Sequence, residues 1–225
     1  MKKMDLDFII FDLIGTTIKD NKEGGSLILD SFQQAFAING QDISYEALNQ
    51  QRGKRKREAI QQILSDKHLD AKLVDKIYAD FMNLLNQSIT SFSEIKDATK
   101  VFQFVKNKGI KIGIGSGLPL QFMNQLIQHL KWDRALFDYI GSSDELAAGR
   151  PNPIMILEAM KQLQFTDPNR ILKIGDTKVD VQEGKNAGVL TAMVLTGTQN
   201  QASLGNVQPD YIFENINDLT THYLL

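Results

Sequence analysis

The sequence predicts an α/β protein in which a parallel sheet carries an inserted helical domain. Short apolar runs rich in β-branched and aromatic residues recur along the chain, and they are too short for helices. Helical patterns separate the later runs, as expected for strand–helix–strand crossovers. The block over residues 19–94 carries helical patterns and no convincing strand. We therefore expect a core domain over residues 1–18 and 95–225 and an inserted helical domain over residues 19–94.

The expected elements follow in chain order. Strands are predicted at Phe8–Asp12, Lys111–Gly115, Tyr139–Gly141, Ile171–Asp176, Thr191–Leu195 and Tyr211–Phe213. Core helices are predicted at Ala98–Lys108, Leu120–Leu130, Pro153–Leu163 and Val179–Ala187. Helices of the inserted domain are predicted at Ser26–Ala37, Tyr45–Gln51, Lys54–Leu64 and Ala71–Ile89. Hinges between the two domains are expected near Asp20–Gly25 and Ser91–Ile95.

Composition narrows the class of protein. The 225 residues are 42% hydrophobic and 23% charged, as in ordinary globular proteins. A net charge of -2 argues against nucleic acid or a membrane as partner. The absence of cysteine excludes disulfides and a thiol nucleophile. The apolar run Phe8 to Phe11 is too short for a signal peptide or a membrane span, so a cytoplasmic location is expected. Monomer and homodimer both stay open.

Four short stretches carry the candidate chemistry. Asp12 ends the first predicted strand and precedes Gly15-Thr16, Ser116-Gly117 follows the second, and Asp176 ends the fourth. Arg150 lies in a Gly-Arg-Pro turn, and Asp180 follows Asp176 by four residues. Because the carboxyl ends of parallel strands meet at one edge of the sheet, we expect these side chains to form one site.

These residue types suit phosphoryl transfer. The Asp12 carboxylate can attack phosphorus and form an aspartyl-phosphate that water hydrolyses. Backbone amides at Thr16 can approach phosphoryl oxygens, and the Ser116 hydroxyl with the Gly117 amide can hold another. Arg150 offers a planar fork of donors to a phosphate or to Asp12. The sequence therefore predicts substrate contacts from this set.

In this order and spacing the four stretches resemble the motifs of the haloacid dehalogenase (HAD) superfamily of aspartyl-phosphate hydrolases. The resemblance implies a Rossmann-like core with a helical cap of the C1 type. It also implies Mg²⁺ held by Asp12, Asp176 and the backbone carbonyl of Ile14, with Asp180 behind them or bound through water. Such an ion would neutralise charge between the nucleophile and an anionic substrate.

Ile14 departs from the phosphatases of that superfamily, which place a second aspartate there. That aspartate protonates the leaving alcohol and later activates water, and isoleucine can do neither. Losing a general acid–base group costs about 10²–10⁴-fold in rate, unless the leaving group needs no proton or another residue supplies it. Ile14 therefore narrows the reactions that this site can perform.

A second resemblance, to phosphonoacetaldehyde hydrolase (phosphonatase) and its relatives, fits this departure. Their first motif also lacks the second aspartate, their third-motif cation is arginine, and a cap lysine in Gly-x-x-Lys forms a Schiff base. Gly53-x-x-Lys56 matches that spacing. At about 100° per residue, Lys56 lies within the apolar arc of its helix, unlike Lys54, Arg55 and Arg57. Lys56 is thus either an activated amine or a lysine that reaches out from the helix edge.

Other functions stay open. Ala59 stands where phosphonatase has histidine, which favours a sister group and leaves the substrate undefined. The alternatives are a phosphate monoester phosphatase, a metal-free haloalkanoate dehalogenase and a catalytically impaired protein that binds phosphate or a partner. The acidic pair Asp176 and Asp180 argues against the dehalogenase, which needs no metal. We expect a Mg²⁺-dependent hydrolase of a small organophosphonate or phosphate. Its catalytic residues would be Asp12, Lys56, Ser116 and Arg150.

Overall fold

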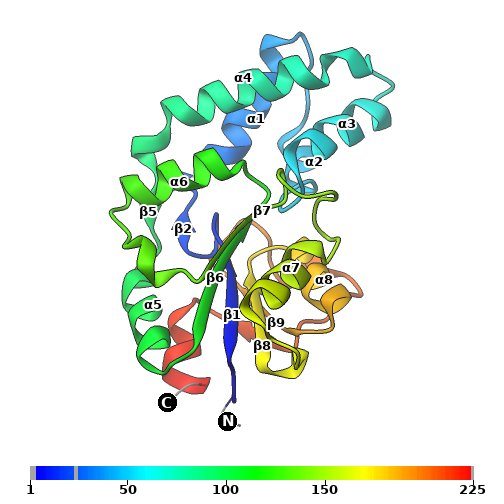
Figure 1. Cartoon of the computed structure of the whole chain (residues 1–225). Helices are drawn as coiled ribbons and strands as arrows, with labels where there is room; N and C mark the ends of the chain where they lie inside the picture. Colours follow the sequence, from blue (N-terminus) through cyan, green and yellow to red (C-terminus); the bar gives the residue numbers. More distant parts are fainter. Residues whose placement is uncertain (1–3, 23–24, 224–225) are drawn as a thin grey trace.

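The computed structural model describes residues 4–22 and 25–223, and a six-stranded parallel sheet forms the centre of the core domain (Figure 1). The strand order is β10–β9–β8–β1–β6–β7. The strands are β1 (Phe8–Asp12), β6 (Lys111–Ser116), β7 (Tyr139–Ser142), β8 (Ile171–Gly175), β9 (Leu190–Val194) and β10 (Tyr211–Phe213). Each lies within one residue of its predicted bounds, which confirms the predicted α/β core.

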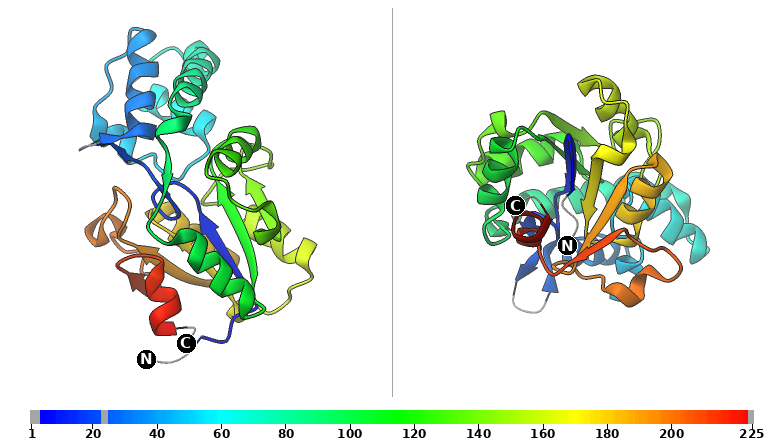
Figure 2. Two further views of the ribbon diagram at one scale, coloured as in Figure 1. Left: turned by 90° about the vertical axis from the view of Figure 1, so that its left-hand side faces the viewer. Right: turned by 90° about the horizontal axis from the view of Figure 1, so that it is seen from below.

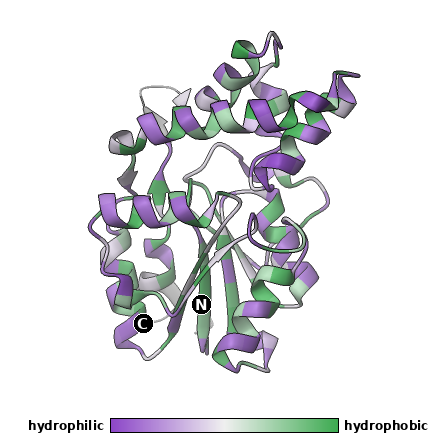
Figure 3. Cartoon of the chain, turned by 45° about the horizontal axis from the view of Figure 1, so that its top comes forward, coloured by the Kyte–Doolittle hydropathy of each residue, from purple (hydrophilic) through white to green (hydrophobic). Residues whose placement is uncertain are grey.

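The central strand β1 is buried on both faces because helices cover both sides of the sheet (Figure 2). Ile9 and Phe11 pack with the cluster that includes α5 (Ala98–Asn107) and α6 (Leu120–His129). Phe8 and Ile10 pack with the cluster that includes α7 (Ile154–Leu163). Helix α8 (Lys178–Ala187) packs on β8 and β9. Figure 3 shows that hydrophobic residues, drawn in green, predominate along the central strands.

The cap lies over the carboxyl ends of the strands, and its described residues form four α-helices (Figure 1). These are α1 (Leu27–Ile38), α2 (Tyr45–Asn49), α3 (Lys56–Asp66) and α4 (Val74–Gln87). Phe32 of α1 and Phe81 of α4 bring their ring centroids to 4.9 Å. Shorter turns are η1 (Ala71–Leu73), η2 (Ile89–Ser91), η3 (Arg134–Leu136), η4 (Pro168–Arg170), η5 (Gln201–Leu204) and the π turn η6 (Leu219–Tyr223).

Two short antiparallel pairs join the cap to the core, and they correct one prediction. β2 (Ile18–Lys19) pairs with β5 (Ser93–Glu94), and β3 (Asn21–Lys22) pairs with β4 (Gly25–Ser26). The expectation that residues 19–94 contain no strand is therefore wrong. A strand of two residues has no readable periodicity, and the pairing of β2 with β5 depends on chain segments far apart in sequence. The boundaries near residues 18 and 94 stay predictions.

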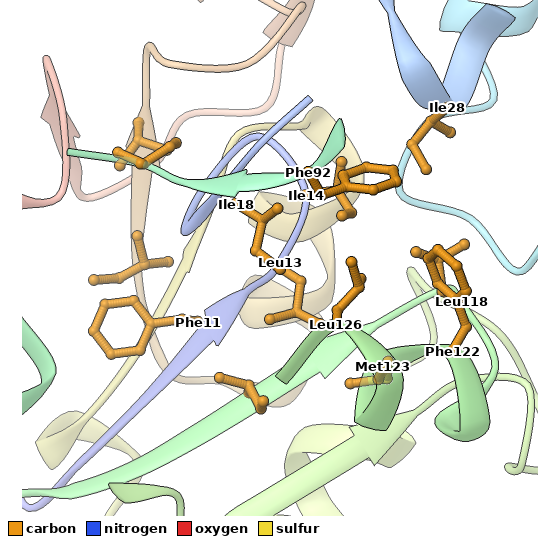
Figure 4. Packing of buried hydrophobic residues seen from close by; sticks show 14 of the residues in the cluster. Phe11, Leu13, Ile14, Ile18, Ile28, Phe92, Leu118, Phe122, Met123 and Leu126 are labelled. Carbon is orange, nitrogen blue, oxygen red and sulfur yellow. The ribbon is translucent and has the colours of Figure 1, made fainter. Parts of the chain in front are cut away.

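Apolar side chains continue from the sheet through this joint into the cap (Figure 4). Ile14 and Ile18 follow β1, and Phe92 lies beside them on the returning chain. Ile28 of α1 lies on the cap side of this group, and Leu118 lies on the core side. Among the described residues, no helix combines the length and the apolar composition that a membrane span requires.

Candidate active site

Three neighbouring strands bring the predicted core residues together. Asp12 is the last residue of β1, Ser116 the last of β6, and Asp176 follows the last residue of β8. Strand β1 lies between β6 and β8 in the sheet, so all three side chains emerge at one edge. Gly15, at φ +92°, allows the first turn to approach Asp176, since a Cβ there would lie 2.4 Å from Oδ2 of Asp176.

Arg150 is the centre of a buried chain of charges. Its Nη1 donates to Oδ1 of Asp12 at 2.7 Å and to Oδ1 of Asp180 at 2.5 Å. The ammonium of Lys173 lies 3.1 Å from Oδ1 of Asp180 and 3.3 Å from Oε2 of Glu183. All five side chains are buried. These buried charges hold the guanidinium of Arg150 against Asp12. Asp12 is one of the two partners that the sequence predicts for Arg150, the other being a phosphate.

Sequence reasoning missed Lys173 and Glu183. The one available signal was a lysine inside the otherwise apolar strand Ile171–Gly175, which requires a buried counter-charge. Asp180 also accepts more hydrogen bonds than a residue that only supports a metal ion would need. Its Oδ2 accepts hydrogen bonds from the Thr177 hydroxyl at 2.5 Å and the Thr177 amide at 3.2 Å, as part of the capping box of α8.

Asp12, Asp176 and Asp180 each place a carboxylate oxygen within 4.8 Å of the others, which is close enough to share a cation. Oδ2 of Asp176 is buried and has no hydrogen-bond partner among the described residues. Burial raises the pKa of Asp176 to about 8, and the negative charge of Asp12 adds to this shift, whereas Arg52 opposes it. Burial also raises the pKa of Asp12. The three crowded carboxylates, with one oxygen of Asp176 left without a partner, fit a divalent cation such as Mg²⁺.

The predicted substrate-binding residues have additional partners. The Thr16 hydroxyl donates to Oδ1 of Asp176 at 3.3 Å and so orients that carboxylate. The Ser116 hydroxyl accepts a hydrogen bond from the Leu118 amide at 3.2 Å. Gly117 meets the cap directly, because a Cβ on Gly117 would lie 2.5 Å from the carbonyl oxygen of Lys54. The absence of a side chain at Gly117 thus allows the cap to close on the core.

Lys56 comes from the cap as the first residue of α3 and is 5% exposed. Its amine donates to the carbonyl oxygen of Lys54 at 3.0 Å. Burial, followed by the positive charges of Arg150 and Arg52, lowers the pKa of Lys56 to about 7. The amine is therefore partly neutral near pH 7, as a nucleophile requires. The buried face of the same helix consists of Ala59, Ile60, Ile63 and Leu64.

Arg52 also belongs to the site, although the sequence analysis gave it no role there. Its Nη1 donates to Oδ2 of Asp20 at 2.5 Å and to the Ser26 hydroxyl at 2.9 Å. Its Nη2 lies 4.0 Å from Oδ2 of Asp176. Arg52 is the cap residue just before Gly53, and it was hidden in the sequence by the four cations that follow closely.

Cap and core line a pocket of about 30 Å³, which is room for water-sized molecules. Gly53, at φ +79°, lies against the core, since a Cβ there would be 2.7 Å from the Thr177 hydroxyl. Arg55 donates to the carbonyl oxygen of Asp144 at 2.9 Å. The lining residues are Asp12, Ile14, Ile28, Arg52, Gly53, Lys56, Ser116, Gly117, Leu118, Arg150 and Thr177.

Comparison with known proteins identifies the class of this fold and site. The sequence profile of the haloacid dehalogenase-like hydrolases matches residues 9–194, and the chain belongs to this family. It is 31% identical to phosphonoacetaldehyde hydrolase from Vibrio campbellii over 220 residues, covering 91% of this chain and 79% of the relative. It is 27% identical to the enzyme of that name from Bacillus cereus, covering 87% and 78%. The predicted resemblance to phosphonatase relatives is thereby confirmed.

Solved structures confirm the fold. A hydrolase from Pseudomonas syringae superposes with a TM-score of 0.85 at 16% identity, covering 96% of this chain and 97% of the other. A phosphonoacetaldehyde hydrolase-like protein from Oleispira antarctica gives a TM-score of 0.84 at 20% identity, covering 98% and 92%. At these identities the likeness concerns the fold alone, a parallel α/β core with a helical cap.

Proposed function

We propose that this protein is a phosphonatase-like hydrolase that cleaves the carbon–phosphorus bond of a small β-carbonyl phosphonate. One observation carries the proposal: the buried amine of Lys56 lines the same small cavity as Asp12 and as Ile14, which stands where phosphatases of the family have a second aspartate. A carbon leaving group needs an electron sink, and an imine on Lys56 supplies one. The relatives named phosphonoacetaldehyde hydrolase support this choice of substrate.

The reaction divides between cap and core. The Lys56 amine adds to the substrate carbonyl and expels water, which leaves a protonated imine. Asp12 then attacks phosphorus, the C–P bond breaks, and its electron pair forms an enamine with the imine nitrogen as acceptor. Water hydrolyses the aspartyl-phosphate to phosphate. The enamine takes a proton on carbon and is hydrolysed, so that phosphonoacetaldehyde and one water give acetaldehyde and phosphate.

Arg150 and Ser116 would hold phosphonyl oxygens during attack, with Arg150 oriented by Asp180 and Lys173. Asp12 and Asp176 would hold Mg²⁺, together with the Ile14 carbonyl, and Asp180 would support Arg150. When bound, the ion neutralises charge between the carboxylate and the anionic substrate. The cap closes at Gly117 and Gly53, which excludes bulk water from the first step.

The imine is tested by reductive trapping. Borohydride with phosphonoacetaldehyde is expected to attach the two-carbon fragment to Lys56, detected by peptide mass spectrometry. Lys56→Ala is expected to abolish the adduct. Lys54→Ala is the matched control, because Lys54 lies in the same run but donates to Gln51 Oε1 at 2.8 Å instead of being buried. Equal trapping in Lys56→Ala would refute the imine.

A phosphate monoester is the second candidate substrate, because the core residues Asp12, Ser116 and Arg150 suit any phosphoryl group. A screen of phosphonates and phosphate esters with Mg²⁺ separates the two. Turnover of phosphonates that requires Lys56 supports the proposal. Turnover of esters alone, unchanged by Lys56→Ala, favours the phosphatase. Any turnover that survives Asp12→Ala removes that residue from the nucleophilic role.

A further inference from the structure

Arg52 is a buried charge in the cavity wall for which the reaction above has no use. Its side chain is 5% exposed. The two hydrogen bonds described for it both leave from Nη1, toward Asp20 and Ser26. Nη2 lies 4.0 Å from Oδ2 of Asp176, which is beyond hydrogen-bond distance. Within the described residues, Nη2 therefore makes an ion-pair contact with Asp176 but no hydrogen bond, which leaves its N–H groups able to bind an anionic ligand.

The other side of the guanidinium is held firmly in place. Oδ2 of Asp20 accepts the bond from Nη1, while Oδ1 of Asp20 accepts from the Ile28 amide at 3.0 Å. Ser26, which also accepts from Nη1, is the N-cap of α1. The hinge and the first cap helix thus fix the orientation of Arg52. Its free N–H groups are preorganised and need no reordering to bind a ligand.

Arg52 comes from the cap and lines the same cavity as Lys56, with its Nη2 4.0 Å from Oδ2 of Asp176. The core supplies Asp12, Ser116 and Arg150 to the phosphonyl group, whereas Arg52 and Lys56 both come from the cap. They line one cavity of about 30 Å³, and the charge of Arg52 contributes to the lowered pKa of Lys56. The guanidinium is therefore close to the amine that attacks the carbonyl carbon, and a group attached to that carbon comes within its reach.

We propose that Arg52 determines specificity by binding a carboxylate on the carbonyl carbon, so that the preferred substrate is a β-carbonyl phosphonate bearing a carboxylate. This inference rests on the proposed function, because it keeps the imine on Lys56 and the aspartyl-phosphate on Asp12. The bond changes are the same, and the product beside phosphate is a 2-oxo acid. A hydrogen or methyl group in that position would leave Nη2 without an acceptor.

The test compares ligands that differ only in this group. 3-Phosphono-2-oxopropanoate carries the carboxylate, 2-oxopropylphosphonate carries a methyl group of similar size, and phosphonoacetaldehyde carries hydrogen. The wild type is expected to prefer the carboxylate over the methyl compound by about 10- to 100-fold in kcat/KM, since a hydrogen bond to a charged group is worth this much. The preference is expected to reside in KM, because the carboxylate does not react.

Arg52→Gln is the test variant, since glutamine can still donate to Asp20. It is expected to lose the preference for the carboxylate compound over the methyl compound. The readout is the ratio of the two kcat/KM values, because removing the Arg52 charge also acts on Lys56 and changes the rate with every substrate. Arg52→Lys, which keeps the charge, is expected to restore part of the preference. Arg57→Gln is the matched control, because Arg57 follows Arg52 by five residues but contacts Asp75 and the ring of Tyr78. Arg57→Gln is expected to keep the full preference.

Calorimetry on Asp12→Asn, which binds without turnover, gives a second readout. Tighter binding of the carboxylate ligand, weakened by Arg52→Gln, supports the inference. Equal losses for all three ligands in Arg52→Gln would overturn it, because Arg52 would then contact the phosphonyl group or support the fold. Turnover of phosphonoacetaldehyde with no carboxylate preference overturns the inference alone. Absence of both turnover and binding for all three overturns the proposed function as well.

Discussion

The core and the cap contribute to this site by different means. The core residues stand at the ends of adjacent strands, and a chain of buried charges from Asp12 to Glu183 holds them in place. Of the cap residues, Lys56 begins α3 and Arg52 precedes it by four residues, and both reach the site only while the cap is docked. The core half is therefore fixed by the sheet, and the cap half depends on closure.

This difference suggests a division of labour. The core half suits stabilisation of the transition state at phosphorus, because hydrogen-bond donors there must be preorganised. The cap half suits selection of the carbon portion of the substrate, because the cap can open to admit a ligand and close upon it. Each of the following substitutions alters the core half or the cap half, and the measurement shows whether the other half keeps its function.

The largest effect is expected for Asp12→Asn. An amide does not attack phosphorus, and loss of a covalent nucleophile costs roughly 10⁴- to 10⁶-fold in kcat. Phosphate release measures this loss. Trapping of the imine on Lys56 is expected to persist, because the cap half does not need Asp12. Loss of trapping together with turnover would contradict the separation of the two halves.

Lys173→Met is expected to destabilise the core half. It leaves Asp180 and Glu183 buried with less counter-charge, and breaking a buried ion pair costs about 3–5 kcal/mol in the free energy of unfolding. Urea unfolding measures this change. The matched control is Lys111→Met, since Lys111 lies on the neighbouring half of the sheet but is 50% exposed beside Asp138. That variant is expected to cost less than about 1 kcal/mol.

Similar losses of unfolding free energy in Lys173→Met and Lys111→Met would mean that the buried row of charges stabilises the fold no more than a surface ion pair does. A loss confined to Lys173→Met, accompanied by a fall in kcat, would show that these charges also position Arg150.

Gly117→Ala is expected to impair the cap half through closure. The new Cβ would lie 2.5 Å from the Lys54 carbonyl oxygen, so the cap loop must move. Overpacking of this kind costs about 1–3 kcal/mol, and we expect KM for the phosphonate to rise about tenfold. Gly40→Ala is the control: Gly40 has φ +72° and no neighbour within 4 Å. It is expected to lower stability slightly and leave KM unchanged, whereas a normal KM in Gly117→Ala would contradict this closure contact.

The smallest effect concerns pH. Imine formation needs the neutral amine, and the pKa of Lys56 is about 7. Protonation below that value removes the nucleophile, so the rate of trapping with cyanoborohydride is expected to fall as pH drops through 7, approaching tenfold per unit. As pH rises above 7 the rate levels off. A profile that keeps rising to pH 10 would mean that Lys56 keeps the ordinary pKa of a lysine.

The core half could be predicted from the sequence because its signals are local. An aspartate or serine at the end of an apolar strand has a known place in a parallel sheet, so Asp12, Ser116 and Asp176 were predicted to meet, and they do. The helical period of its neighbours placed Lys56 on the apolar arc but left open whether its amine is buried or reaches out from the helix edge, and the structure shows that Lys56 is buried. The strands β2 and β5 could not be predicted, since two residues carry no period.

By itself, the sequence determined the order of strands and helices, the inserted cap and the residue types at the strand ends, because these follow from periodicity and side-chain chemistry within a few residues. Only the tertiary structure decided which charges pair. Two ion pairs show this: Lys173 pairs with Asp180, and Arg52 pairs with Asp20. No local sequence pattern says that these side chains come close to one another. Their energy depends on burial and geometry, which exist only after the chain has folded.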